Sequence, residues 1–227
     1  MVSRGTTRRD CAGDGQLGFP VMSDDVTDEQ AAQLRDFAER VRHSPHNLVS
    51  RRARDELHTR HVPEAVALAR LLPFGPHRLL DVGSGGGFPG IVIAIVRPDL
   101  EVHLLESTRK KVTFLQEVTA ALGLDLTVHH GRAEELARRT ELAHSFDLVT
   151  ARAVAALGEL LDLTLPFLAA DGVLYAVKGE RWAEELAAAE QALRRAGGVV
   201  LATPDDLLAT VGESEQLPRV VMIGRGR

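Results

Sequence analysis

Leu79-Leu80-Asp81-Val82-Gly83-Ser84-Gly85-Gly86-Gly87-Phe88-Pro89-Gly90 is the stretch that decides the fold. Four residues suited to the end of a buried strand precede five glycines in eight positions, and the apolar run 91–96 follows. A strand, a glycine turn and a helix in that order predict the first unit of an α/β fold of the nucleotide-binding type. Glycine is needed because the chain reverses sharply and a ligand must approach its backbone.

Two classes of ligand use such a turn. Dinucleotide enzymes use G-x-G-x-x-G with a pyrophosphate at the helix N-terminus. The spacing of Gly85, Gly87 and Gly90 satisfies that pattern. However, the pattern begins two residues too late in the chain, because the strand already ends at Val82. Counted from the strand, Asp81 is followed by G-x-G-x-G, which resembles motif I of the S-adenosylmethionine-dependent methyltransferases. An acid there can receive an ammonium, directly or through water, and would repel a pyrophosphate. The pattern therefore favours S-adenosylmethionine over a dinucleotide, and a turn with no ligand is disfavoured because so many glycines cost folding entropy.

Composition limits the class of protein. The chain has 227 residues, of which 44% are apolar, enough for one well-packed domain with a short extension. No run is long and apolar enough to span a membrane, and the N-terminus lacks the apolar core of a signal peptide. Cys11 is the single cysteine, so neither a disulfide framework nor a cysteine metal site is expected. We expect a cytoplasmic monomer without a metal, and a net charge of −5 means that RNA binding would need a local basic patch.

Three parts are predicted along the chain: a disordered tail over 1–25, a helical extension over 26–76 and a ligand-binding domain over 77–227. The extension opens with a capping box at 27–30 and an amphipathic helix that ends near Ser44-Pro45. Its densest positive cluster is formed by Arg51, Arg52, Arg54 and Arg60. That cluster is either a solvated helix face or a patch that contacts phosphates.

Downstream of the extension, strands and helices alternate, which predicts a mostly parallel seven-stranded sheet with helices on both faces. Strands are expected at 79–82, 101–106, 124–130, 146–150, 172–179, 199–203 and 219–223, and helices at 91–96, 109–123, 157–167 and 181–196. Glu106 ends the second strand, roughly 20 residues after the glycines, where an acid can hold both hydroxyls of a ribose. The alternative is an ordinary acid at a helix N-terminus.

Other segments of the chain add a more specific resemblance. They are residues 47–50, 60–61, 81–91, 97–98, 106–111, 131–134, 152–153 and 178–179. With these segments the chain resembles the bacterial 16S ribosomal RNA guanine-N7 methyltransferase G family, also called glucose-inhibited division protein B, from about residue 27 to the end. Gly-Phe-Pro-Gly-Ile at 87–91 and Arg-Ala at 152–153 are more specific than motif I alone. Glu64 and Ala65 stand where the family usually has Asp-Ser, and Val49 stands where it usually has Thr or Ile.

The resemblance implies a Rossmann-like class I methyltransferase that uses S-adenosylmethionine to methylate N7 of a guanine in 16S ribosomal RNA of the small ribosomal subunit. It implies that the cofactor is bound by Gly83, Ser84, Gly85, Gly87, Phe88, Glu106, Ser107, Thr108, Ala133, Glu134 and Arg152. Glu106, Ser107 and Thr108 would flank the ribose and adenine, and Ala133 and Glu134 would meet the adenine edge. The candidates for RNA contact are Arg60, His61, Arg152 and Lys178. His61 could instead be a surface or packing residue.

The residues also restrict the atom that is methylated. Methylation of pyrimidine C5 normally needs a cysteine nucleophile, and Cys11 lies in the expected tail. Methylation of an exocyclic amine commonly uses an Asn/Asp-Pro-Pro-aromatic element after strand four, where this chain has Ala-Arg-Ala-Val at 151–154. Guanine N7 already has an in-plane lone pair and needs neither, so catalysis would be mainly positioning and we name no general base. The base must be reachable, in single-stranded or splayed-out RNA.

Three other functions stay open at this point. A methyltransferase of the same fold could act on a small molecule or a protein. A dinucleotide-binding oxidoreductase would use the same turn for a different ligand. A non-enzymatic RNA-binding module could keep the fold and transfer no methyl group.

Overall fold

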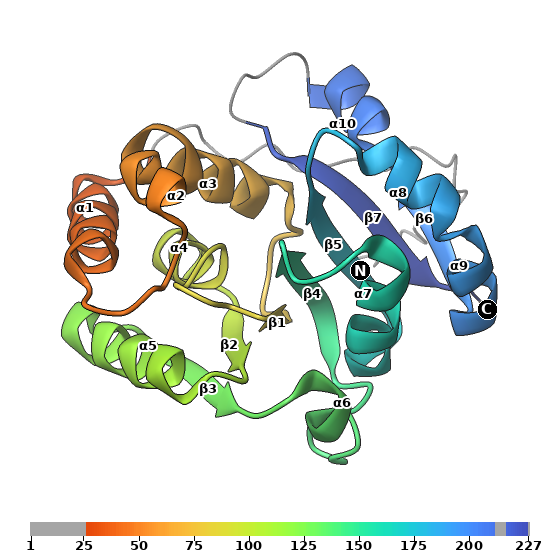
Figure 1. The fold of residues 1–227 in the computed structure, drawn as a ribbon, viewed down its shortest axis with the longest axis horizontal. Helices are drawn as coiled ribbons and strands as arrows, with labels where there is room; N and C mark the ends of the chain where they lie inside the picture. Colours follow the sequence, from red (N-terminus) through yellow and green to blue (C-terminus); the bar gives the residue numbers. More distant parts are fainter. Residues whose placement is uncertain (1–25, 212–216, 227) are drawn as a thin grey trace, which may run out of the picture.

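The computed structural model describes residues 26–211 and 217–226, without the side chain of Val211. The tail expected over 1–25, with Cys11, lies outside the described residues. The described chain forms a seven-stranded sheet in the order β3-β2-β1-β4-β5-β7-β6, and β7 is antiparallel to both of its neighbours. The mostly parallel seven-stranded sheet with helices on both faces is therefore confirmed (Figure 1).

The elements have the following bounds. The strands are β1 (Arg78–Val82), β2 (Glu101–Glu106), β3 (Leu126–His130), β4 (Phe146–Arg152), β5 (Leu168–Lys178), β6 (Gly198–Ala202) and β7 (Arg219–Arg225). The helices are α1 (Asp28–His43), α2 (Arg51–Asp55), α3 (Val62–Leu71), α4 (Gly90–Val96), α5 (Arg109–Leu122), α6 (Ala133–Leu136), α7 (Leu157–Thr164), α8 (Trp182–Ala188), α9 (Glu190–Ala196) and α10 (Pro204–Val211). A π-helical turn, Leu57–His61, precedes α3, and a 3₁₀ turn, Leu165–Phe167, follows α7.

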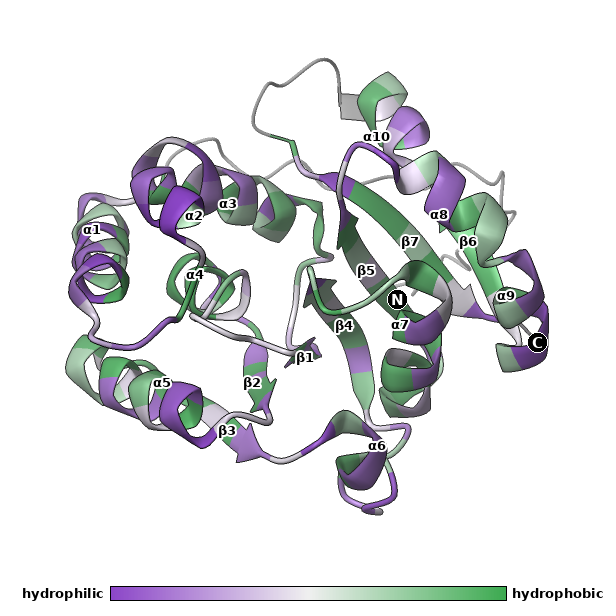
Figure 2. Ribbon diagram, viewed as in Figure 1, coloured by the Kyte–Doolittle hydropathy of each residue, from purple (hydrophilic) through white to green (hydrophobic). Residues whose placement is uncertain are grey.

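Two apolar cores lie on opposite faces of the sheet. Because side chains alternate along a strand, Leu79 of β1 and Leu148 of β4 enter the core that α1, α3, α4 and α5 complete. Their neighbours Leu80 and Val149 enter the second core, under α6, α7 and α9. Central strands buried on both faces read as continuous apolar runs, and Figure 2 shows β5 and β7 mostly in the hydrophobic colour.

The N-terminal extension packs into the first of these cores. The predicted capping box at Thr27 is present, and α1 buries Leu34, Phe37, Ala38 and Val41. Gln30 Nε2 donates to Ile95 O at 3.0 Å and Gln33 Nε2 donates to Leu122 O at 3.1 Å. These bonds tie α1 to the ends of α4 and α5. The boundary between 76 and 77 stays a prediction.

A fully buried Arg97 connects the end of α3 with the loop between α4 and β2. Its Nη1 donates to Ala69 O and Leu72 O, both at 3.0 Å, and its Nη2 lies 2.7 Å from Asp99 Oδ2. The last carbonyls of a helix have no partner within the helix, and Arg97 supplies partners at the end of α3. The Arg-Pro segment at 97–98 therefore has a structural role.

Some element bounds differ from those expected. β5 begins at Leu168 rather than 172, because Leu168 pairs with Phe146 ahead of an irregularity in the register. β4 extends to Arg152, and the helix expected over 181–196 is two helices that meet at Ala189. Neither α6, α10 nor the π-helical turn was predicted from the sequence. Among the described helices, none combines the length and apolar character that a membrane span requires.

Candidate active site

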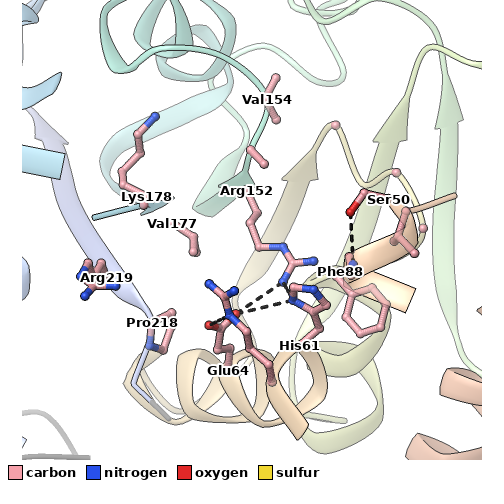
Figure 3. A pocket seen from close by; sticks show the side chains of 18 of the residues that line it. Ser50, His61, Glu64, Phe88, Arg152, Val154, Val177, Lys178, Pro218 and Arg219 are labelled. Carbon is pink, nitrogen blue, oxygen red and sulfur yellow. Dashed lines mark hydrogen bonds and ion pairs between the residues drawn. The ribbon is translucent and has the colours of Figure 1, made fainter. Parts of the chain in front are cut away.

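A pocket of about 900 Å³ opens at the carboxyl ends of β1, β4 and β5 (Figure 3). Its walls come from the glycine turn, the segment after β4, the end of β5, the extension and residues 217–219. Residues 217–219 reach it because β7 runs antiparallel, which places Arg219 opposite Lys178. Ligands of open α/β sheets bind beyond the carboxyl ends of the strands, so this pocket is the candidate site.

The glycine turn is held by main-chain bonds and by close packing. Gly83 N and Ser84 N both donate to Leu105 O, at 2.8 and 3.0 Å. Gly83, Gly85 and Gly87 have φ of 72°, 57° and 93°, in the region that favours glycine. A Cβ at Gly87 would lie 2.7 Å from Ile91 Cγ1, whereas a Cβ at Gly85 would meet nothing nearer than Gly83 O at 3.7 Å. Gly87 is thus required by packing, and Gly85 leaves open space at the pocket.

Glu106 lies beside this turn at the end of β2 and is 5% exposed. Its Oε2 accepts from Gly85 N at 3.0 Å, and its Oε1 accepts from Thr108 N at 2.7 Å and Ser107 Oγ at 3.5 Å. A carboxylate offers about four lone pairs, so Glu106 keeps acceptor capacity for hydroxyl groups. The residues present fit the ribose that the sequence predicts here.

The predicted adenine-side residues lie next to Glu106. Gly131 N donates to Glu106 O at 3.1 Å, which brings the start of α6 alongside the end of β2. Ala133 is buried there and Glu134 is exposed. The 900 Å³ pocket is not lined by Glu106, Ser107, Thr108, Ala133 or Glu134. Gly87 does not line it either, because it packs against Ile91 and Phe37.

Asp81, expected to receive an ammonium directly or through water, is instead enclosed by protein groups. It is 1% exposed, and its carboxylate accepts from Thr150 Oγ1 at 2.9 Å and Gly90 N at 3.2 Å. Burial raises the pKa of Asp81 to about 6, against the opposing effects of Thr150, Ser84, Gly90 and Arg152. Asp81 does not line the pocket and its bond from Gly90 N holds the start of α4, so its position favours a structural role over direct capture of an ammonium.

Arg152, the last residue of β4, joins the extension to the sheet. Its Nη1 lies 3.0 Å from His61 Nδ1 and 3.8 Å from Glu64 Oε2, and its guanidinium carbon lies 5.3 Å from the centre of the Phe88 ring. A guanidinium can only donate, so His61 Nδ1 is the acceptor in this contact. Burial lowers the pKa of Arg152, while Glu64 and Asp81 oppose that shift; arginine still stays charged.

Glu64, one of the departures from the family pattern, lies at the centre of this group. Burial raises its pKa, but the proximity of His61, the hydrogen bond from Arg60 and the charges of Arg60 and Arg152 outweigh burial and lower it overall. Arg60 Nε lies 2.8 Å from Glu64 and Arg60 Nη1 lies 3.3 Å from Glu56. The structure thus brings Arg60, His61 and Arg152 together around an ionised carboxylate.

The arginine cluster of the extension is partly neutralised. Arg52 Nε lies 2.8 Å from Glu56 Oε1, and the same acid contacts Arg60. Arg54 Nη2 donates to His46 O at 3.5 Å, and Arg51 is exposed on α2. Figure 2 shows α2 as a strongly hydrophilic helix. Whether the cluster contacts phosphates stays a prediction.

Lys178 lies on another wall of the pocket and is not free. Its Nζ lies 2.6 Å from Glu185 Oε2 and donates to Ala155 O at 2.9 Å. Its side chain is 6% exposed. The pocket is also lined by Glu185, Val154, Pro218 and Arg219, which were not predicted as site residues; the only available signal was that Arg219 starts a final strand. The described residues hold no group of three or more His, Cys, Asp and Glu side chains that could bind a metal.

Comparisons with known proteins agree on one family. The family model described as rRNA small subunit methyltransferase G matches residues 30–208. A protein of Sorangium cellulosum named ribosomal RNA small subunit methyltransferase G is 44% identical over 170 residues, covering 72% of this chain and 71% of that protein. A protein of Pseudarthrobacter chlorophenolicus with the same name is 44% identical over 165 residues, covering 71% and 74%.

Solved structures of low identity share the fold. A precorrin-6y C5,15-methyltransferase from Geobacter metallireducens has a TM-score of 0.52 at 17% identity, covering 81% of this chain and 93% of that one. A mutant of MtNAS in complex with S-adenosylmethionine has a TM-score of 0.56 at 15% identity, covering 86% and 73%. At these identities the likeness concerns the fold alone.

Proposed function

The chain belongs to the rRNA small subunit methyltransferase G family, and we propose that it transfers the methyl group of S-adenosylmethionine to N7 of a guanine in 16S ribosomal RNA. The observation that supports this assignment within the molecule is the pocket that brings together the glycine turn and Arg152 at the ends of the neighbouring strands β1 and β4. We further propose that the protein acts as a cytoplasmic monomer on the RNA or the small subunit.

The cofactor would be held at the glycine turn and the end of β2. Gly83, Ser84, Gly85 and Phe88 line the pocket there, and Glu106 would receive the ribose hydroxyls. Ser107, Thr108, Ala133 and Glu134 would surround the adenine side. When bound, S-adenosylmethionine supplies an electrophilic methyl group on a sulfonium. Gly87 would support the turn without touching the ligand, because its Cα faces Phe37 and Ile91.

Arg152 is the residue that we place between cofactor and base. One of its amino groups binds His61 and lies 3.8 Å from Glu64, and its remaining donors make no hydrogen bond with the part of the chain that the structure describes. Arginine pairs well with the O6 edge of guanine, and O6 neighbours N7 on the same edge. Arg152 would thereby orient the base and leave the lone pair of N7 free. Arg60 and His61 would lie on the RNA side of the pocket.

No residue needs to remove a proton in this reaction. N7 of guanine attacks with a lone pair that lies in the plane of the ring, so the task of the protein is to align two reactants. The ionised Glu64 lies 3.8 Å from Arg152, and its charge helps to accommodate the cationic base that results. A reaction without a general base is consistent with this pocket, because the Nδ1 atom of His61 already binds Arg152.

The test uses the purified chain with S-adenosylmethionine labelled in its methyl group. Small subunits, free 16S ribosomal RNA and large subunits are incubated in parallel, and the RNA is digested and analysed by mass spectrometry for 7-methylguanosine. We expect label at one guanine of 16S ribosomal RNA and none in the large subunit. Label in protein, in a small molecule or at another atom would overturn the proposal, and calorimetric binding of NAD in place of S-adenosylmethionine would favour an oxidoreductase.

A further inference from the structure

We propose that Lys178 is a positioning residue for this reaction, which with Glu185 fixes the segment 153–156 between the glycine turn and the substrate side of the pocket. The inference rests on the proposed methyl transfer for its kinetic consequences. Its structural content does not depend on the identity of the substrate.

The ammonium of Lys178 joins three elements. Lys178 ends β5, Glu185 lies on α8, and Ala155 follows β4. The 2.6 Å ion pair with Glu185 and the 2.9 Å bond to Ala155 O occupy two sides of the ammonium. Figure 3 shows the Lys178 side chain turned toward the segment that carries Val154 and away from His61 and Glu64.

The segment after β4 has few other anchors. Ala153 has a φ of 53°, a left-handed conformation that costs a residue with a side chain some free energy. Between described residues, no main-chain hydrogen bond to main chain fixes 153–155 outside the strands and helices. The bond from Lys178 to Ala155 O therefore supplies a restraint that the backbone does not supply itself.

The restrained segment touches the glycine turn. A Cβ placed on Gly83 would lie 2.7 Å from Val154 Cγ2, so Val154 occupies the space directly over that glycine. Arg152 immediately precedes the segment, and both residues line the pocket. A shift of 153–156 would move the wall next to the cofactor and the residue placed against the base, and an error of about 1 Å can cost about 10²-fold in rate.

A phosphate contact would be an unfavourable use of this lysine. An ammonium with 6% of its side chain exposed would have to leave a carboxylate at 2.6 Å to reach a phosphate. Separating a buried ion pair leaves an uncompensated charge and is costly. The two roles for Lys178 predict opposite effects for its partner, which provides the test.

The deciding variant is Glu185→Gln, which keeps the shape of the side chain and removes its negative charge. If Lys178 contacts phosphate, this change frees a cation and lowers KM for RNA. If Lys178 positions the segment, kcat falls about tenfold to a hundredfold while KM for RNA stays within about twofold. Lys178→Met should do the same, and the double variant Lys178→Met with Glu185→Gln should be non-additive with the two single variants.

Glu184→Gln is the matched control, since Glu184 is the preceding residue and pairs only with exposed Arg181 among the interactions of described residues. It changes net charge equally and should leave kcat and KM unaltered. Thermal unfolding of each variant shows whether it remains folded, and Glu185 is 31% exposed, so Glu185→Gln is expected to fold.

A second measurement does not need turnover. Affinity for S-adenosylhomocysteine should fall in Lys178→Met and Glu185→Gln but not in Glu184→Gln. Unchanged affinity with a raised KM in Lys178→Met and a lowered KM in Glu185→Gln would overturn the proposal. If the unaltered protein fails to methylate small-subunit RNA, the proposed function fails, while ligand affinity still decides the positioning role.

Discussion

The backbone N–H of Gly85 donates to Oε2 of Glu106 across the gap between the ends of β1 and β2, at 3.0 Å. The acid proposed to hold the ribose therefore also supports the glycine turn that faces the pocket. Its other oxygen accepts from Thr108 N at the start of α5. A single carboxylate thus accepts hydrogen bonds from the turn and from the loop after β2, and would also bind the proposed ligand.

Glu106→Ala should weaken binding of S-adenosylhomocysteine by about 1–3 kcal/mol, the range for lost hydrogen bonds to a charged group. Calorimetric titration measures the loss, and 2′-deoxy and 3′-deoxy analogues should lose less than the natural ligand. Glu117→Ala, an exposed acid on α5, is the control that should bind normally. Equal losses for all three ligands would show that Glu106 acts only on the turn.

Gly85→Asp should abolish cofactor binding while the chain stays folded. The added side chain would project into open space with a φ of 57°, where aspartate is tolerated, and its charge would add to that of Glu106. Normal affinity in Gly85→Asp would contradict the assignment of the turn.

Gly87→Ala should instead destabilise the fold and lower the melting temperature, because its Cβ would lie 2.7 Å from Ile91 and 3.1 Å from Phe37.

The parts of the fold that the sequence predicts well are those with local signals. β2 was predicted with the bounds that it has, because an apolar run ends there in an acid after a fixed interval from the glycines. The α1 cap was predicted because Thr27 and Gln30 satisfy each other over three residues. No local signal marks the break at Ala189, where good helix formers continue on both sides, or the π-helical turn before α3.

The candidate site was predictable only where one segment builds it. The glycine turn could be found because its residues are contiguous. The Arg152–His61 contact joins residues 91 positions apart, and Lys178 was predicted to face RNA because its acidic partner lies on a helix that the sequence does not place beside it. Side-chain partners of charged residues depend on the tertiary arrangement, which residue types and spacing leave open.

Arg97→Met should lower the free energy of unfolding by about 3–5 kcal/mol, the cost of removing one partner of a buried ion pair. The change leaves Asp99 and the carbonyls of Ala69 and Leu72 without their donor. Arg40→Met is the control, since its pair with Asp36 is almost half exposed on both sides and should contribute about 0–1 kcal/mol. Similar losses in chemical denaturation would contradict the role of Arg97.

Asp81 should give stability a specific dependence on pH. Its pKa is raised from the usual 3.8 to about 6 in the folded protein, so the folded chain binds a proton in this range that the unfolded chain has lost. The contribution is fully present below about pH 4 and is lost as pH rises through about 6. The difference in free energy of unfolding between the unaltered protein and Asp81→Asn should fall by roughly 3 kcal/mol over that window. A constant difference would mean that Asp81 stays ionised.

The arginine cluster should affect RNA binding through salt dependence. Each phosphate contact contributes about 0.7–0.9 to the slope of log affinity against log salt, so Arg51→Gln should lower the slope by up to that amount if Arg51 contacts RNA. Arg52→Gln and Arg60→Gln should lower it less, because Glu56 and Glu64 compete for these side chains. Filter binding at several salt concentrations measures the slopes, and affinity for S-adenosylhomocysteine should not change.

Reversal of all four charges, at Arg51, Arg52, Arg54 and Arg60, separates a binding patch from a solvated helix face. Arg194→Glu is the control, because Arg194 is 68% exposed on α9, which packs on the opposite face of the sheet from the extension. A patch that contacts phosphates predicts that the quadruple variant needs far more RNA at moderate salt, while cofactor titrations stay flat because the glycine turn is untouched. If RNA methylation and its salt dependence survive the quadruple variant, the cluster is a solvated face, and recognition must come from the strand ends around Arg152 and Arg219.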